Sequence, residues 1–292
     1  VWTRNKATIT FDTDGGNTIE AITNTCGTAL NLPTPTKTGY TFAGWYNGET
    51  QFTATTMPEE SLTLKARWTA NTNTAYKVEH YWQNLADDGY TLHETENKTG
   101  TTGAQTAAAA KSYPGFAAGT VTQTAIAPDG SAVVKINYTR NSYTLTVDAD
   151  NGTAASEATY KFGAAITAPA APTKTGHTFK GWDKTIPETM PAGNVTVKAT
   201  WTINQYTITF DTDGGSDVAA IKQDYGTDIT APAAPTKTGH TFKGWDKTIP
   251  TTMPAENVTI KATWTANRYV VTFNSDGGSQ CGSMTVTYGQ PY

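Results

Sequence analysis

The chain repeats itself at an interval of 63 residues. Residues 166–187 and residues 229–250 both read ITAPAAPTKTGHTFKGWDKTIP, and the match resumes after a single difference, Glu188 against Thr251. A diverged copy occupies residues 7–71, which keep the FDTDGG, PTKTG and GW sequences. Such an internal repeat predicts small structural units in tandem, each of which contacts its neighbours along the chain.

The repeat predicts how the 292 residues divide into modules. We expect full repeats at residues 7–71 (module 1), 142–204 (module 3) and 205–267 (module 4). Residues 72–141 (module 2) have a different sequence and are expected to form a module of another kind. Residues 268–292 (module 5) are expected to be the truncated start of a further repeat.

The two ends of the chain also carry repeat sequence. Residues 1–6 match the end of a repeat, so they are expected to be the tail of a preceding one, and the chain a window on a longer array. The connectors between modules are very short, as in Ile203-Asn204-Gln205, and short connectors leave neighbours in contact. We therefore expect the modules to form an elongated rod.

Module 4 shows the strand pattern of a full repeat. Residues 206–210 alternate apolar and polar side chains, as a half-buried strand does, and the DTDGG sequence that follows predicts a turn. Further strands are expected at residues 219–225, 241–245 and 258–264. The expected core residues alternate along these strands and are Ile208, Phe210, Phe242, Val258, Ile260, Ala262 and Trp264.

Module 2 is predicted to contain a hairpin and a short helix. Residues 76–82 and 90–95 flank the turn sequence Asp87-Asp88-Gly89, which predicts a β-hairpin. Residues 106–111 read TAAAAK, a strong helix-forming sequence that the following Pro-Gly pair ends. Residues 132–138 are expected to close the module as a strand. The predicted fold class is thus mainly β, of the α+β type.

The charge and hydropathy of the chain exclude several classes of partner. Charged residues make up only 16% of the sequence, the net charge is −4, and Lys and Arg form no cluster, so nucleic acid is not expected as a partner. No run of about eighteen apolar residues is present, so this segment is not expected to insert into a membrane. Cys26 and Cys281 lie at unmatched positions in the first and last repeats, and both are expected to be unpaired.

The D-x-D-G-G sequences that begin at Asp12 and Asp211 are similar to the start of a calcium-binding loop. An EF-hand loop needs a bidentate Glu at its twelfth position, where this chain has Thr23 and Lys222. A lysine there would bring a cation in place of a carboxylate. A hairpin turn is therefore the favoured interpretation.

The remaining polar residues do not predict a catalytic or metal site. The histidines lack the convergent spacing of zinc ligands, although two of them could meet across the hairpin of module 2; they are His80, His93, His177 and His240. No nucleophile elbow, metalloprotease motif or phosphate-binding loop is present. We expect no catalytic residue, no metal and no cofactor, and we do not expect the chain to be an enzyme.

Aromatic residues supply the candidate binding positions. Each full repeat has two tryptophans at strand positions, as at Trp245 and Trp264, and this regularity predicts core residues rather than a glycan-stacking surface. Trp82 in module 2 breaks the pattern and is the candidate for an exposed aromatic. Together with the nearby Tyr76 and Tyr81, it forms our candidate binding set.

The repeat motif resembles a known family. A strand followed by D-x-D-G-G, a PTK-x-G-[YH]-TF-x-GW sequence and a closing strand that ends in Trp are similar to the internalin-type B-repeat, or Listeria–Bacteroides repeat. Residues 76–81 (YKVEHY), 100–103 (GTTG) and 113–116 (YPGF) of module 2 resemble a MucBP (mucin-binding-protein) module. Module 3 departs from the pattern at residues 147–152, which puts its first turn in doubt.

The resemblance carries implications for fold, location and function. It implies a β-grasp (ubiquitin-like) fold for each module, secretion, and attachment to the cell wall of a Gram-positive bacterium through other parts of a large adhesin. It also implies no enzymatic activity. We expect a stalk or spacer in which adjacent repeats contact each other. The alternatives are direct binding of a host-surface glycan or protein by module 2, and homophilic self-association through exposed strand edges.

Overall fold

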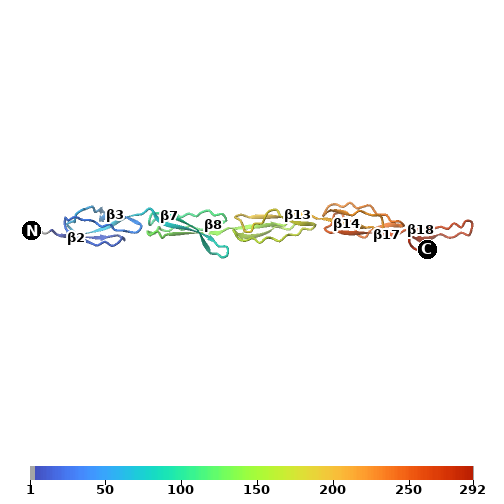
Figure 1. Ribbon diagram of the computed structural model, residues 1–292, viewed down its shortest axis with the longest axis horizontal. Helices are drawn as coiled ribbons and strands as arrows, with labels where there is room; N and C mark the ends of the chain where they lie inside the picture. The colour runs from blue at the N-terminus through green and yellow to red at the C-terminus, as the bar shows by residue number, and fades with distance from the viewer. Residues whose placement is uncertain (1–3, 292) are drawn as a thin grey trace. The chain divides into compact units, whose positions relative to one another are not determined.

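The computed structural model describes residues 4–291, and all the secondary structure in this part of the chain is β-strand. The strands form five sheets, and each sheet takes its strands from one stretch of sequence, so each has a narrow colour range in Figure 1. Among the described residues no helix is long and apolar enough to cross a membrane. The mainly β prediction is confirmed and its α part is wrong. The match of residues 1–3 to the end of a repeat lies outside the described residues.

The described chain divides into two units. The first unit runs to Tyr143 and includes Thr159–Ala165 and Thr189–Gly193. The second consists of Thr144–Ala158, Ile166–Glu188 and the chain from Asn194 onward.

The first unit contains the sheets of modules 1 and 2. In module 1 the strand order is β2-β1-β5-β3-β4, and the strands are β1 (Lys6–Asp12), β2 (Ile22–Thr25), β3 (Tyr40–Asn47), β4 (Thr50–Gln51) and β5 (Leu62–Ala70). In module 2 the order is β7-β6-β9-β8, and the strands are β6 (Thr74–Gln83), β7 (Tyr90–Gly100), β8 (Phe116–Ala118) and β9 (Val133–Arg140).

The second unit takes its strands largely from modules 3, 4 and 5. The strands of module 3 have the order β11-β10-β13-β12 and are β10 (Ser142–Asp148), β11 (Ser156–Lys161), β12 (His177–Trp182) and β13 (Val195–Ile203). Those of module 4 have the order β15-β14-β17-β16 and are β14 (Gln205–Asp211), β15 (Ile221–Asp224), β16 (His240–Trp245) and β17 (Val258–Ala266). Module 5 contributes a hairpin of β18 (Arg268–Val271) and β19 (Met284–Thr287).

The four larger sheets share one topology. The first and last long strands of each module, such as β1 with β5 and β14 with β17, pair in parallel at the centre. The other strands pair antiparallel at the edges, as β2 does with β1 and β16 with β17. All four predicted strands of module 4 are confirmed, and the hairpin predicted in module 2 is the pairing of β6 with β7.

The cores form within individual modules. In module 4 the buried cluster is Ile208, Phe210, Met253 and Ile260, and Val258 packs against it from the edge. Module 1 has its own cluster around Ile9, Trp45 and Leu64. Ala262 is also buried, whereas Phe242 and Trp264 are half-buried and lie edge to face, 5.4 Å apart. In module 4 the alternation of apolar residues along the strands therefore predicted Ile208, Phe210 and Ile260 of the core, but not Met253.

The helix predicted at residues 106–111 is wrong, because side chains hold this segment in an extended form. The amide nitrogen and the carbonyl oxygen of Ala108 both bond to the Gln123 side chain, at 3.0 and 2.8 Å. The Lys111 amide donates to the Tyr138 hydroxyl at 2.8 Å. These bonds occupy the backbone groups that a helix would pair internally, so the intrinsic preference of alanine for helix is overridden.

Candidate functional site

The three candidate aromatic residues of module 2 lie in different environments. Tyr76 is only 3% exposed, and its hydroxyl accepts the Ala107 amide at 3.2 Å. Tyr81 is half-buried, and its hydroxyl donates to Glu79 at 2.6 Å. Trp82 is partly buried against the core instead of exposed. The structure therefore does not bring the three residues together as an open binding surface.

A bulge in the hairpin explains the position of Trp82. The register shifts between His80 and Tyr81, so that His80 pairs with Glu94 and Tyr81 with Leu92, and His93 has no partner. The Trp82 indole then lies between the rings of His93 and Phe116, at centroid distances of 3.4 and 4.6 Å. His80 and His93 consequently do not pair across the strands. Alternation alone would not have revealed this, because a bulge changes which face each later residue occupies.

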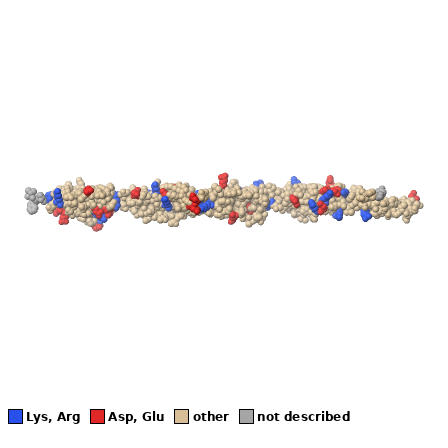
Figure 2. Space-filling model, turned by 90° about the horizontal axis from the view of Figure 1, so that it is seen from below, with Lys and Arg blue, Asp and Glu red and all other residues tan. Residues whose placement is uncertain are grey.

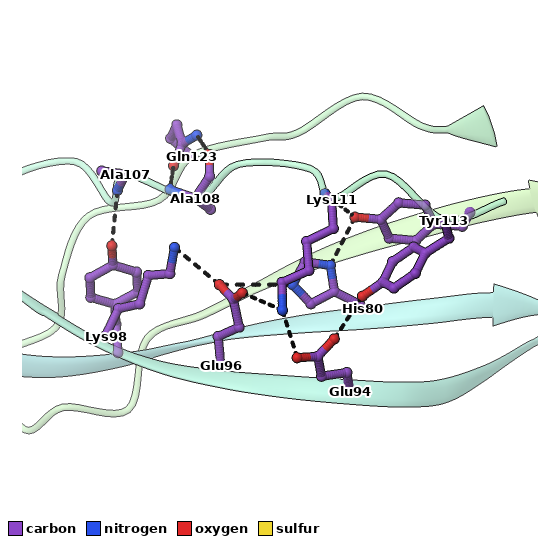
Figure 3. A network of polar contacts seen from close by, with 11 residues as sticks. His80, Glu94, Glu96, Lys98, Ala107, Ala108, Lys111, Tyr113 and Gln123 are labelled. Atoms are coloured by element: carbon purple, nitrogen blue, oxygen red, sulfur yellow. Dashed lines mark hydrogen bonds and ion pairs between the residues drawn. The ribbon is translucent and has the colours of Figure 1, made fainter. Parts of the chain in front are cut away.

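His80 is a buried, neutral member of a polar network (Figure 3). Its side chain is fully buried, and Nδ1 lies 2.8 Å from the Tyr138 hydroxyl. Because this hydroxyl already accepts the Lys111 amide, its own proton is directed at Nδ1. The ring proton is then on Nε2, which has no hydrogen-bond partner and lies 4.0 Å from a Glu96 carboxylate oxygen. Burial lowers the pKa of His80 below 6.5, so the neutral form is favoured.

A layer of charged groups covers this histidine. Lys111 Nζ lies 2.6 Å from an oxygen of Glu94 and 2.6 Å from an oxygen of Glu96 (Figure 3). The bond from Lys111 to Glu96, together with a second bond from Lys98, lowers the pKa of Glu96 from 4.5 to about 2. Burial, reinforced by the bond to Glu94, raises the pKa of Tyr113 to about 12. All these charges are paired, so the network fixes the extended segment onto the hairpin.

Module 2 is expected to lose stability as the pH falls. A histidine whose pKa is lowered on folding stabilises the protein above its unfolded value of 6.5, and this contribution is lost as the pH falls from there. The contribution of Glu96 is lost lower, between 4.5 and about 2. Thermal denaturation from pH 8 to pH 4 should show the first loss, and His80→Gln should remove it. Equal pH dependence of the two proteins would contradict the assignment.

The D-x-D turns hold lysines of the same module. In module 4, Lys261 lies 3.0 Å from Asp213 and 3.9 Å from Asp211, and Lys65 and Lys198 occupy the same place in modules 1 and 3. Acidic and basic side chains therefore lie beside each other on the surface in Figure 2. Within residues 4–291 no cluster of acidic, His or Cys side chains fits a metal ion. The carboxylates of these turns are thus paired with lysine ammonium groups.

The turn of module 3 keeps only part of the pattern. Asp150 has the same positive φ as Asp213, 46° against 50°, and its amide likewise bonds the first Asp side chain of the turn. The turn of module 4 is closed by the Gly215 amide on the Thr212 carbonyl, whereas in module 3 the Thr153 amide bonds the Asn151 side chain. The doubt over residues 147–152 thus concerns the second half of the turn alone.

An asparagine joins consecutive modules at every connector. Its amide donates to the carbonyl of a glycine in the module before it; these pairs are Asn71 with Gly39, Asn141 with Gly115, Asn204 with Gly176 and Asn267 with Gly239, at 2.8–2.9 Å. Its carbonyl accepts an amide of the module after it, from Thr102, Phe162, Tyr225 and Tyr288 respectively, also at 2.8–2.9 Å. We call each such set of contacts a junction. Every junction therefore has backbone hydrogen bonds to both of its modules.

Side chains add to these junctions. The Thr178 hydroxyl donates to the Asn204 side-chain oxygen at 2.6 Å, and Thr241 does the same to Asn267. The recurring asparagine is visible in the sequence, but its role was not predicted, because strand patterns do not show which backbone groups lack partners.

Cys26 and Cys281 carry free thiols and make no disulfide.

Arg140 distinguishes the junction between modules 2 and 3. Its Nε donates to the Gln83 carbonyl at 2.7 Å and its Nη1 to the Phe162 carbonyl at 2.9 Å. The guanidinium also lies 4.9 Å from the ring centre of Phe116 and 5.9 Å from that of Phe162. At the same junction, Lys161 lies 3.6 Å from Asp88 of the hairpin turn. The arginine therefore links three chain segments with a single side chain.

Comparison with known families assigns the full repeats. Residues 8–67, 143–200 and 206–263 each match the Listeria-Bacteroides repeat domain. These matches fall within modules 1, 3 and 4, and module 2 has no match of this kind. The resemblance of module 2 to a MucBP module thus stays a prediction.

Several curated proteins are similar to this chain. A protein of Evansella cellulosilytica described as a Gly-rich membrane protein is 31% identical over 86% of this chain and 33% of its own length. A second membrane protein of that organism is 35% identical over 51% of this chain and 25% of its own length. Internalin H of Listeria monocytogenes is 42% identical over 35% of this chain and 22% of its own length. The chain thus spans a third or less of each relative.

Among solved structures, the Bacillus anthracis TIE protein matches with a TM-score of 0.33 and 9% identity, over 70% of this chain and 55% of that one. This likeness is too low to support a fold assignment.

Proposed function

Because this chain belongs to the Listeria-Bacteroides repeat domain family, we propose that it is a non-catalytic repeat region of a bacterial cell-surface protein, where it acts as a stalk or spacer. The observation that carries this proposal is the set of junctions, in which each connecting asparagine bonds to both of its modules. A chain with hydrogen-bonded connectors resists bending between modules, unlike one with flexible linkers. Separate core clusters in modules 1, 2 and 4 further support a modular spacer.

The proposal includes location and module architecture. The similar membrane proteins and the internalin support an extracellular position, with attachment to the cell wall through parts of the parent protein outside these residues. The parallel pairing of the first and last long strands supports the β-grasp relationship proposed for each module. No partner other than the adjacent repeats is needed for a spacing role.

A stalk is expected to be much longer than it is wide in solution. Modules of this size have diameters of roughly 27 Å, so four in line would span about 110 Å. Small-angle scattering of the full chain should then give a radius of gyration above about 30 Å, compared with about 19 Å for one compact fold of the same length. The measurement should not change with protein concentration. A value near the compact limit would refute the spacing role.

Direct adhesion by module 2 is the alternative function. Tyr81 is half-buried and is the one member of the predicted binding set that does not belong to or pack against the module core, and Leu85 of the hairpin turn is 47% exposed. Binding of the full chain to mucin or a glycan array, weakened by Tyr81→Ala, would favour this function and name a host-surface glycan or protein as partner. If the full chain bound neither mucin nor a glycan, direct adhesion would be excluded and the spacing role would remain.

Homophilic self-association is favoured by one strand edge. β7 has 11 residues and lies at the edge of its sheet, where Leu92 is 46% exposed. The edge strands β2 and β15 of modules 1 and 4 have only 4 residues each. Long open edges can pair with another chain. Sedimentation that stays monomeric at high concentration would exclude this alternative.

A further inference from the structure

In three of the four junctions a glycine faces an aromatic ring of the following module. In three junctions these pairs are Gly115 with Phe162, Gly176 with Tyr225 and Gly239 with Tyr288, and a Cβ built on the glycine would overlap the ring. The glycines also have positive φ angles, between 68° and 81°, which other residues rarely adopt. Two independent constraints, backbone conformation and the nearby ring, thus require glycine at each position.

The residue after this glycine completes the contact. It is aromatic in each of the three junctions, namely Phe116, His177 and His240. Each of these rings lies edge to face with the ring from the following module, at centroid distances of 5.5–5.9 Å and interplanar angles of 77°. The following module's ring therefore packs against a glycine backbone and an aromatic ring. We call the glycine and its aromatic neighbour a socket, and the ring that packs on it a plug.

The plug is itself part of a local turn that recurs in modules 3, 4 and 5. Phe162, Tyr225 and Tyr288 are each followed by a glycine with positive φ, between 75° and 78°. The plug's amide is the group that bonds the connecting asparagine, so backbone and side chain act at the same point. One residue thus both receives the connector and fills the socket.

The junction between modules 1 and 2 is built differently. Its socket is Gly39-Tyr40, but the position of the plug is occupied by Thr102, which has no ring. Pro128 of module 2 instead approaches the glycine, and a Cβ on Gly39 would lie 2.8 Å from it. In module 1, Cys26 takes the plug position, since its amide bonds the Asn5 carbonyl at 2.9 Å. Plug identity therefore varies between modules, whereas the socket glycine does not.

We propose that the socket is a docking surface for the aromatic-glycine turn of a following repeat, and that plug and socket couple the folding of the two modules they join. The partner of a socket is thus a repeat that carries Phe or Tyr followed by Gly at this position. The inference deepens the proposed spacing role, since a stalk whose modules unfold together resists extension better than independent modules do. Modules 3 and 4 form the best-matched pair for a test, because both are full repeats.

The test compares two glycine variants of the full chain by hydrogen exchange. Gly176→Ala and Gly152→Ala both place alanine at a positive φ, 70° and 90°, but only at Gly176 does the new Cβ meet a ring. Peptides from β11 report on module 3 and peptides from β15 on module 4; residues 166–187 and 229–250 are unsuitable because their sequences are identical. Gly176→Ala should raise exchange in both β11 and β15 by about tenfold over Gly152→Ala.

Substitution of the plug provides the second arm. Tyr225→Ala should also raise exchange in β11 of module 3, although the changed residue belongs to module 4, while Tyr225→Phe should leave exchange unchanged. The double variant Gly176→Ala, Tyr225→Ala should raise exchange by less than the sum of the two single effects, because the new Cβ no longer overlaps the Tyr225 ring. A rise limited to one module, or equal effects of Gly176→Ala and Gly152→Ala, would overturn the coupling. If scattering still showed an extended particle, the spacing role would stand without the coupling between modules.

Discussion

Replacing Arg140 by alanine is expected to lower the free energy of unfolding of module 2 by about 3 kcal/mol or more. The change removes two charge-assisted hydrogen bonds, to the carbonyls of Gln83 and Phe162, and the contacts of the guanidinium with two aromatic rings. Each such bond contributes about 1.5 kcal/mol or more when its acceptor is shielded from water. The effect is measured by urea denaturation of the full chain with tryptophan fluorescence as the probe. Comparison with chains in which Trp82 is replaced identifies the part of the signal that comes from module 2.

Two further variants separate the geometry of Arg140 from its charge. Arg140→Lys keeps the positive charge but loses the planar group that reaches both carbonyls, so it should recover less than half of the loss. Arg67→Ala is the matched control, because Arg67 also covers a ring, Tyr46, but its side chain is 41% exposed and pairs with the carboxylate of Glu49. It should cost less than about 1 kcal/mol. Equal losses for Arg67→Ala and Arg140→Ala would contradict the role assigned to Arg140.

Strand positions could be predicted where local pattern and tertiary packing agree. In module 4, residues 206–210 and 258–264 alternate apolar and polar side chains, and they pair as the parallel central strands β14 and β17. The turn between β14 and β15 was predicted from its Asp and Gly residues, and Asp213 and Gly214 adopt the positive φ angles that such residues permit. The repeat itself then extended one reliable assignment to three modules.

The prediction failed in module 2, where tertiary contacts override local preference. Residues 106–111 favour a helix in isolation, but bonds from Gln123 and Tyr138 hold them extended. These partners lie 12 or more residues away in the sequence, so no local window contains them. The position of Trp82 was missed for a similar reason, since the bulge before Tyr81 follows from strand register and not from composition.

The candidate site was predicted less well than the fold. Contact between neighbouring modules follows from the short connectors, but the contacts themselves depend on Asn204, Gly176 and Tyr225, which are far apart in the sequence. Each of these residues recurs at the matching position of the next repeat, as Asn267, Gly239 and Tyr288. That recurrence was the available signal. It was not decisive because glycine and asparagine are also common in ordinary turns.

Tyr138→Phe is expected to cost module 2 about 2–4 kcal/mol of stability, although it removes a single oxygen atom. Tyr138 is only 1% exposed, and its hydroxyl bonds both the His80 ring and the Lys111 amide. Without it, two buried polar groups lose a partner, and each unsatisfied group costs about 1–3 kcal/mol. The segment at residues 106–111 also loses one of the bonds that oppose helix formation. Thermal denaturation of the full chain measures the loss.

Tyr81→Phe is the matched control for this prediction. It deletes the same atom from the same module, but Tyr81 is half-buried, and its hydroxyl donates to the side chain of Glu79. A loss of less than about 1 kcal/mol is expected there, because water can replace the hydroxyl. If Tyr138→Phe lowered the stability as little as Tyr81→Phe, the residues around His80 would be stabilised by packing and not by the hydrogen bonds of the Tyr138 hydroxyl. Its hydrogen bonds would then have no part in holding residues 106–111 extended against the helical preference of the TAAAAK sequence.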